Sequence, residues 1–163
     1  DRNITIALTI GTLATTTSGT AFDFTSIPSG VRRITVNFRG VSLSGTDNVL
    51  VQIGTGGSPT TSGYVSTSIS VDNAGGSSAA TSTAGYVIGV ATAAAVISGS
   101  ITISLIDSTN NVWIASHSSK KSTTESMFGG GDVALAGVLD NLRITRTGTD
   151  TFDAGSLNIS YEF

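Results

Sequence analysis

The feature that most constrains this chain is the alternation of apolar and polar residues with a period of two, which recurs along the sequence while helical periodicity is nearly absent. The clearest run is SLNISYEF, residues 156–163, in which Leu157, Ile159, Tyr161 and Phe163 have the same parity. Successive side chains of a strand point to opposite faces, so this run has one apolar and one polar face. The pattern predicts an all-β chain whose last strand holds the C-terminus in a sheet.

Similar runs, bounded by clusters of Gly, Ser, Asn and Asp, predict about 9–11 short strands. The predicted strands are 3–10, 31–41, 48–54, 64–71, 86–90, 99–107, 112–118, 133–137, 138–147 and 156–163. Many short strands without a convincing helix are typical of two packed sheets. We therefore expect a single domain, residues 1–163, folded as a two-sheet antiparallel sandwich with a jelly-roll-like arrangement.

Turn residues indicate how some of these strands connect. The sequence STNN separates 99–107 from 112–118, and we expect these two strands to form a hairpin. The sequence SGTDN separates 31–41 from 48–54, which we expect to be hairpin partners or neighbours. Segments rich in Gly, Ser and Thr are expected to be loops or turns, namely 55–63, 72–85 and 118–132.

The composition describes an unusual surface and excludes several classes of protein. Of the 163 residues, 25 are Thr, 24 are Ser and 20 are Gly, and only 12% are charged, so hydroxyl and backbone groups must meet most of the solvent. With eight basic residues and a net charge of −3, the chain lacks the clustered Lys and Arg that nucleic acid binding needs. The longest apolar run, 84–97, is shorter than the roughly 20 residues of a membrane-spanning helix, so we expect no membrane insertion.

The polar residues do not form a recognisable catalytic motif. His117 is the only histidine, and no G-x-S-x-G sequence accompanies it, so a serine hydrolase is not predicted. Asp150 and Asp153 fall in an expected turn, where aspartate bonds to local backbone rather than acting as one of a glycosidase's paired acids. Asp and Asn also gather in other turns without the fixed spacing of a calcium loop. We expect no enzyme, no cofactor and no metal, although calcium binding by a loop stays open.

Aromatic and arginine side chains are the candidates for binding carbohydrate. Sugars stack on aromatic rings, which makes Tyr64 and Trp113 candidates, and His117 shares the strand face of Trp113. Arg33 and Arg39 have outward parity and suit the carboxylates of an acidic polysaccharide or of another subunit. Each candidate has an ordinary alternative: packing in the core or between subunits for the aromatic residues, a hydrogen-bonded or exposed strand end for the histidine, and a solvated sheet face for the arginines.

A second pair of arginines, Arg143 and Arg146, lies on the predicted strand 138–147. If this strand were a neighbour of 31–41, the two strands could place guanidinium groups on a shared outer face. The alternative is that Asp140 or Glu162 pairs with arginines on a solvated surface, where such pairs contribute little.

Three stretches together resemble domains of tailed-bacteriophage tail fibres, tailspikes and related virion proteins. They are FDFTSIPSGVRRITVNFRGVSLSGTDNVLVQIG (22–54), TSGY (61–64) and LDNLRITRTGTDTFDAGSLNISYEF (139–163), which cover a little over a third of the chain. Their order and spacing carry the resemblance, and no catalytic motif accompanies them. Because the matching positions are strand and turn positions, the resemblance assigns no functional residue.

The resemblance implies a β-sandwich at or near the C-terminal end of a larger virion protein, commonly in homotrimers, that binds host surface glycans or helps the trimer assemble. We therefore expect a non-enzymatic domain of the phage tail that acts outside the cell, beside the rest of the fibre or spike, and attaches to host polysaccharide or lipopolysaccharide. Two alternatives stay open: a trimerisation or stabilisation domain of the same virion protein, and a bacterial secreted carbohydrate-binding module.

Overall fold

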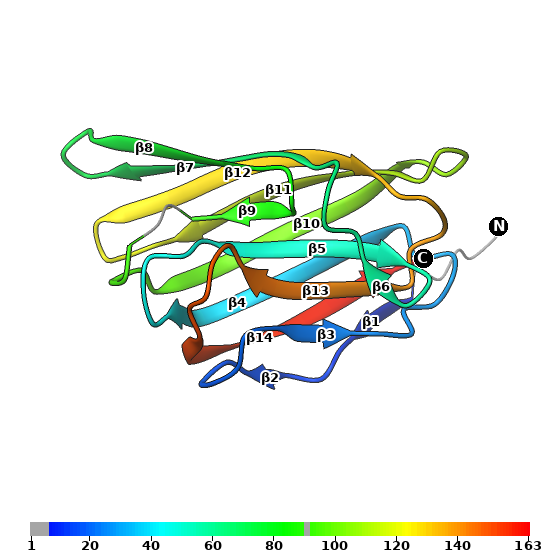
Figure 1. Cartoon of the computed structure of the whole chain (residues 1–163), viewed down its shortest axis with the longest axis horizontal. Helices are drawn as coiled ribbons and strands as arrows, with labels where there is room; N and C mark the ends of the chain where they lie inside the picture. Colours follow the sequence, from blue (N-terminus) through cyan, green and yellow to red (C-terminus); the bar gives the residue numbers. More distant parts are fainter. Residues whose placement is uncertain (1–6, 90–91) are drawn as a thin grey trace, which may run out of the picture.

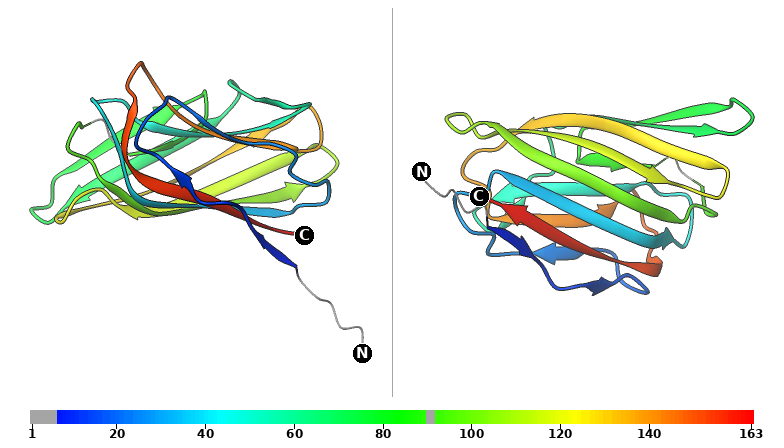
Figure 2. Two further views of the ribbon diagram at one scale, coloured as in Figure 1. Left: turned by 90° about the horizontal axis from the view of Figure 1, so that it is seen from below. Right: turned by 180° about the vertical axis from the view of Figure 1, so that it is seen from behind.

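The computed structural model describes residues 7–89 and 92–163, and these residues form two antiparallel sheets packed as a sandwich (Figures 1 and 2). The strands are β1 (Leu8–Ile10), β2 (Ala14–Thr15), β3 (Phe22–Phe24), β4 (Arg33–Leu43), β5 (Val49–Thr55), β6 (Ser58–Pro59), β7 (Val65–Asp72), β8 (Ser77–Ser82), β9 (Tyr86–Ile88), β10 (Ile97–Asp107), β11 (Val112–Lys120), β12 (Glu125–Ala134), β13 (Asn141–Arg146) and β14 (Phe152–Glu162). The described residues include no helix that is long and apolar enough to cross a membrane.

The order of the strands confirms the predicted jelly-roll sandwich. The nine-stranded sheet has the order β1, β14, β4, β10, β11, β12, β7 and β8, with β2 also paired to β14. The five-stranded sheet has the order β3, β13, β5 and β6, with β9 also paired to β5. The last two strands, β13 and β14, insert beside the first strands of the two sheets. This return of the chain between earlier strands is the Greek-key connection of a jelly roll.

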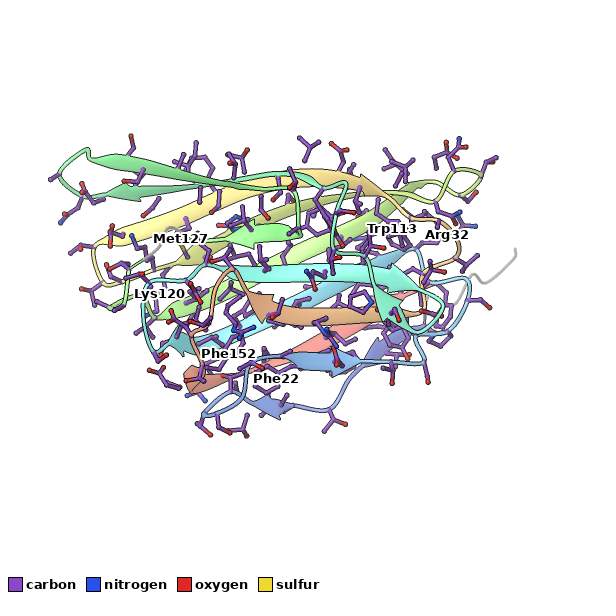
Figure 3. All side chains as sticks on the ribbon, in the orientation of Figure 1. Phe22, Arg32, Trp113, Lys120, Met127 and Phe152 are labelled. Carbon is purple, nitrogen blue, oxygen red and sulfur yellow. The ribbon has the colours of Figure 1, made fainter. Side chains whose placement is uncertain are left out.

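The core lies between the two sheets, where the period-two pattern places it. In β4, Ile34 and Val36 are fully buried, and their pairing partners in β14 include the buried Ile159. At one edge of the sandwich, the rings of Phe22 and Phe152 pack edge to face with centroids 5.1 Å apart (Figure 3). Burial of these apolar side chains is the main source of stability in a chain without cysteine.

One of the two predicted hairpins is confirmed and the other is wrong. β10 and β11 pair antiparallel on either side of their turn. β4 and β5 instead lie in different sheets, so the turn between them carries the chain across the sandwich. β5 is buried on both faces, and Gln52 on its outer side donates a hydrogen bond of 2.8 Å to the carbonyl oxygen of Ala84. Burial of both faces is typical of a strand in the interior of a fold and not of a simple hairpin at the surface.

Two of the expected loops contain long strands. β8 lies within 72–85 and pairs with β7, and β12 lies within 118–132 and continues to Ala134, paired with both β11 and β7. Gly129 to Gly131 are therefore in the middle of a strand. A Cβ at Gly129 would lie only 2.6 Å from His117 Nε2, so glycine is required by the close approach of neighbouring strands. The remaining expected loop contains only the two-residue β6.

Several strand boundaries also differ from the predicted ones. β13 occupies only part of 138–147, the strand expected at 133–137 is reduced to the end of β12, and β14 begins inside an expected turn. The first predicted strand, 3–10, falls partly outside the described residues, which show only β1. Short pieces such as β2 and β6 raise the number of described strands to fourteen.

Candidate functional site

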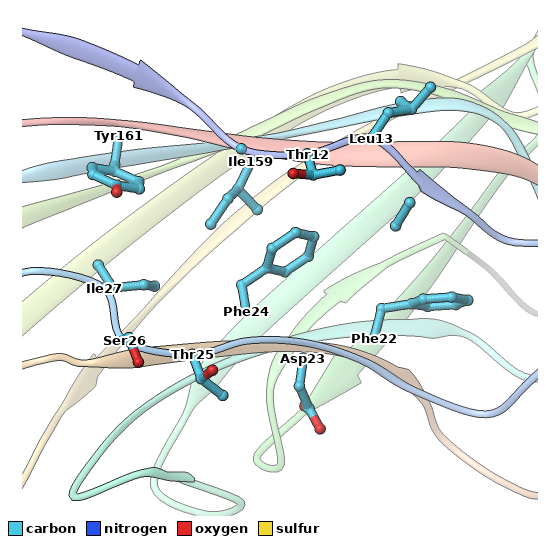
Figure 4. A pocket seen from close by; sticks show the side chains of 12 residues that line it. Thr12, Leu13, Phe22, Asp23, Phe24, Thr25, Ser26, Ile27, Ile159 and Tyr161 are labelled. Atoms are coloured by element: carbon cyan, nitrogen blue, oxygen red, sulfur yellow. The ribbon is translucent and has the colours of Figure 1, made fainter.

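A cleft of about 430 Å³ opens at one edge of the sandwich, between the two sheets (Figure 4). On one side lie residues 11–14 and the β14 side chains Ile159 and Tyr161, and on the other lie β3 and the segment to Ile27 that follows it. β1 and β2 belong to the nine-stranded sheet, whereas β3 is an edge strand of the five-stranded sheet. The cleft is therefore the place where the edges of the two sheets part.

The rim formed by residues 11–14 is held against β14. Both β1 and β2 pair with β14, and the N–H of Gly11 between them donates a hydrogen bond of 2.7 Å to Ile159 O. A Cβ at Gly11 would lie 3.0 Å from the same oxygen, so a larger residue would push the rim outward. Below the rim, the buried Thr16 donates from Oγ1 to Ala154 O at 2.7 Å. The rim is thus fixed at both ends by backbone acceptors of β14.

The opposite wall is built by the sequence Phe-Asp-Phe of β3. Its pairing with β13 places Phe22 and Phe24 on the inner side and Asp23 on the outer side. Asp23 accepts hydrogen bonds from Arg143 Nε at 2.6 Å and Nη2 at 2.9 Å. This bidentate pair lowers the pKa of Asp23 and raises the pKa of Arg143. The ion pair fastens β3 to β13 and turns the carboxylate away from the cleft (Figure 4).

The interior of the cleft is aromatic and uncharged. Phe24 projects from β3 toward β14, from which Ile159 and Tyr161 point back (Figure 4). The rim adds the hydroxyl group of Thr12, and Tyr161 adds its phenolic hydroxyl group. Aromatic rings with a few hydrogen-bonding groups suit a neutral ligand that has both apolar and hydroxylated faces, and pyranose sugars are such ligands. Asp23 is the one charged residue among the described lining residues, and its carboxylate points away from the cleft (Figure 4), so the interior has the chemistry of a site for a neutral ligand.

The structure places the predicted ligand residue Tyr64 inside the core. Only 1% of its surface is exposed, and its hydroxyl accepts a hydrogen bond from Ile53 N and donates one to Ile53 O. Its ring packs edge to face against Tyr86, with centroids 5.0 Å apart. Burial raises the pKa of both tyrosines. Tyr64 therefore packs in the core, bonds to the backbone of β5 and is not accessible to a ligand at the surface.

Trp113 and His117 are also buried, on the inner face of β11. They are 2% and 6% exposed, which agrees with the core-packing alternative for Trp113. Burial lowers the pKa of His117 to about 4, so the ring is neutral at pH 7. Among the described residues, neither ring nitrogen of His117 has a hydrogen-bond partner, and the same is true of Trp113 Nε1. These side chains do not form an exposed stacking platform.

Arg33 and Arg39 are exposed on the outer face of the nine-stranded sheet, as predicted. Arg33 Nε lies 3.2 Å from Glu162 Oε2, which is the ordinary surface pair considered as the alternative. The predicted shared face with the second pair of arginines is wrong, because Arg143 and Arg146 lie on β13 in the other sheet. The structure therefore does not bring the five predicted site residues together: three are in the core, and two are on an outer face.

Of the two aspartates expected in a turn, Asp150 lies between β13 and β14 and bonds to a backbone group as predicted, whereas Asp153 lies in β14 and accepts a hydrogen bond from Ser42 Oγ. Asp150 accepts a hydrogen bond from Asp47 N and Asp47 accepts one from Asp150 N, both at 2.8 Å, so the two turns are tied together. Asp72 and Asp107 accept hydrogen bonds from amides of their own turns. Within the described residues, no three acidic, histidine or cysteine side chains gather as possible metal ligands.

Sequence reasoning missed the residues of the cleft. Phe22, Phe24 and Tyr161 have strand parity and apolar character, which predict burial in the core. What leaves them accessible is the separation of two edges that are far apart in the sequence, and a local pattern does not contain that information. The sequence feature that pointed to the cleft was Phe-Asp-Phe. It places two aromatic side chains on one face of a short edge strand, where the narrow edge of a sandwich has little core to fill.

No protein-family model matches the chain, and no curated protein sequence matches it.

Proposed function

We propose that this chain is a non-enzymatic domain of a tailed-bacteriophage tail fibre or tailspike, and that it attaches to host cell-surface carbohydrate through the cleft beside β3. The observation that carries this proposal is the cleft of about 430 Å³ with Phe24 and Tyr161 inside it, the hydroxyl group of Thr12 at its rim and the carboxylate of Asp23 turned away from it. Its volume lies in the range of small-ligand sites, and one or two sugar rings fit such a space.

The viral part of the proposal is supported by the resemblance of residues 22–54, 61–64 and 139–163 to virion proteins, together with the jelly-roll sandwich. In this proposal the chain belongs to a homotrimer attached to the rest of the fibre or spike, and the ligand is host polysaccharide or lipopolysaccharide. Weak binding in each of three clefts is multiplied when all three meet the same cell surface.

The proposal is tested by binding of the chain to an array of bacterial surface polysaccharides, followed by adsorption to cells that display the bound glycan. Thr12→Glu places a charge at the rim of the cleft, and we expect it to reduce binding at least tenfold. Thr17→Glu is the matched control, because Thr17 is exposed in the same segment but does not line the cleft. Phe24→Ala, which removes the central ring, should abolish binding.

Two outcomes would contradict the proposal. Binding of no bacterial glycan and no bacterial cell would contradict the attachment function. Equal binding by the wild-type chain, Thr12→Glu and Phe24→Ala would show that the carbohydrate site lies elsewhere. Thermal unfolding of Phe24→Ala should be measured in parallel, while Thr12→Glu tests the cleft without removing a packed side chain.

The exposed apolar side chains on the outer face of the nine-stranded sheet favour the assembly alternative, in which the domain trimerises or stabilises the virion protein. Light scattering separates the candidates: a subunit number divisible by three supports a virion domain, and absence of glycan binding from such an assembly would favour the assembly role. The third candidate, a bacterial secreted carbohydrate-binding module, predicts glycan binding without threefold assembly.

A further inference from the structure

The hairpin of β7 and β8 projects beyond the other strands at one end of the molecule (Figures 1 and 2). We call this hairpin, residues 65–82, the wing. On its outer face lie Val65, Ile69 and Val71, and Phe128 of β12 pairs directly with Ile69. Val65 is 67% exposed and Phe128 is 51% exposed. These four residues, here named the wing patch, lie on the outer face of the sheet, with Thr67 between Val65 and Ile69.

The apolar residues of β7 face outward because the inner side of the strand carries serines that accept hydrogen bonds from the backbone. Ser66, Ser68 and Ser70 point inward and are buried. The hydroxyl of Ser66 accepts a hydrogen bond from Val87 N at 2.9 Å, and that of Ser68 accepts one from Gly89 N at 3.2 Å. These serines satisfy backbone donors of β9 and its following residue. The apolar side chains of β7 are consequently left without a covering layer in the described part of the chain.

The edge of the wing is also open. β8 has six residues and, within the described residues, pairs only with β7. The other terminal strands, β1, β3 and β6, have two or three residues. Natural edge strands are usually protected by charge, proline, a bulge or short length, and β8, with the sequence SSAATS, has none of these.

The charge distribution selects the partner that suits this surface. Asp72 is the only charged residue of the wing, and its carboxylate is engaged by Ala74 N and Gly76 N in the hairpin turn. A strongly charged partner finds no complementary group here. A second copy of this chain brings an equally neutral edge and an equally apolar patch, so it meets no like-charge repulsion.

We propose that the wing is a twofold contact in which β8 of one copy pairs antiparallel with β8 of a second copy. Such a pair is related by an axis perpendicular to the sheet, so both outer faces stay on the same side and the contact is isologous. The sheet then continues from one copy into the next, and the two wing patches adjoin. The contact is independent of the carbohydrate proposal and of threefold assembly, because neither the cleft nor its rim takes part.

The experiment is the subunit number of the intact chain over a wide range of concentrations, measured by sedimentation equilibrium. The wing contact predicts an even number: two copies if it acts alone, or six if threefold assembly also occurs. Ala79→Lys places a charge on the exposed edge strand, and the twofold axis brings the lysine of one copy near the lysine of the other. Repulsion between them should break the contact and halve the mass of the assembly. Thr109→Lys, in the exposed turn between β10 and β11, is the matched control and should leave the mass unchanged.

Phe128→Ser, on the wing patch and outside the paired edge, should weaken the same contact. Hydrogen exchange supplies the second readout: the β8 amides that point away from β7 should be protected in the wild type and exchange freely in Ala79→Lys. A monomer or a trimer of the wild-type chain would overturn the proposal. An even assembly whose mass and β8 protection survive Ala79→Lys would also overturn it. Thr12→Glu at the cleft should not alter the mass, so failure of one proposal is distinguishable from failure of the other.

Discussion

The body of the sandwich and the wing use the same period-two pattern in opposite ways. In β14, Leu157 and Ile159 face the core, while Asn158 and Ser160 lie toward the solvent side. In β7, serines face inward and Val65 faces outward. The difference lies in what covers each strand: an apolar sheet covers β14, whereas the backbone of β9 covers β7 and needs hydrogen-bond acceptors. Alternation thus identifies a strand, but the covering element decides which parity is buried.

The largest effect should come from truncating the body. Phe152→Ala removes a fully buried ring that packs against Phe22, and it should lower the free energy of unfolding by about 3–5 kcal/mol. Val65→Ala, on the outer face of the wing, should change it by less than about 0.5 kcal/mol when the chain is dilute. Urea denaturation of both variants measures the contrast, and similar losses would show that the wing patch is packed like a core.

The pH dependence of stability should identify His117, which is the only histidine of the chain. Its folded pKa of about 4 is below the unfolded value of 6.5, so the unfolded state binds the proton first as the pH falls. Above pH 6.5 the imidazole is neutral in both the folded and the unfolded state. As the pH falls from 6.5 to about 4, the free energy of unfolding should decrease by about 3 kcal/mol. Urea denaturation at pH 7 and pH 4.5 measures this loss. His117→Gln should remove most of the difference between the two pH values; an unchanged difference would assign it to the carboxylates.

The inward serines of the wing should contribute more than outward serines of the body. Ser68→Ala leaves the N–H of Gly89 without its acceptor in a buried site, and it should cost about 1–3 kcal/mol. Ser118→Ala, on the exposed side of β11, is the control and should cost less than about 0.5 kcal/mol. Equal stabilities of the two variants in urea would contradict the account of why β7 is inverted.

The smallest effect should come from the surface ion pair of the body. Asp23 and Arg143 are both more than a third exposed, so Arg143→Ala should lower stability by less than about 1 kcal/mol, and less still at high salt. Beside the wing, between β11 and β12, Lys121 is buried and its Nζ lies 3.1 Å from Glu125 Oε1, so Lys121→Ala should be the more costly change. Denaturation at low and high salt compares them, and a larger cost for Arg143→Ala would reverse the expected order.

Much of the body could be predicted from the sequence, because its strands have one clearly apolar parity. The inward side chains of β4 and the hairpin of β10 and β11 follow from that parity and from the turn between them. The wing could not be predicted in the same way. β8 has no side chain larger than threonine, and β12 has glycine where its neighbours come close, so neither strand shows a local apolar face.

The candidate site was beyond local sequence reasoning for a related reason. Tyr64 and Trp113, the aromatic residues predicted to stack on a sugar, fill the core. Phe24 and Tyr161 are accessible because residues 11–14 and β3 belong to different sheets that part at this edge. Accessibility at such a place depends on pairing between segments far apart in the chain, which alternation within one strand does not report.

Binding of carbohydrate in the cleft can be located by amide chemical shifts of the isotopically labelled chain. The titrant is an oligosaccharide prepared from the bacterial polysaccharide that the chain retains on the array. The largest shift changes should occur at residues 11–14 and 22–26, on the two sides of the cleft. Changes centred instead on Arg33 and Arg39, on the outer face of the nine-stranded sheet, would contradict binding in the cleft.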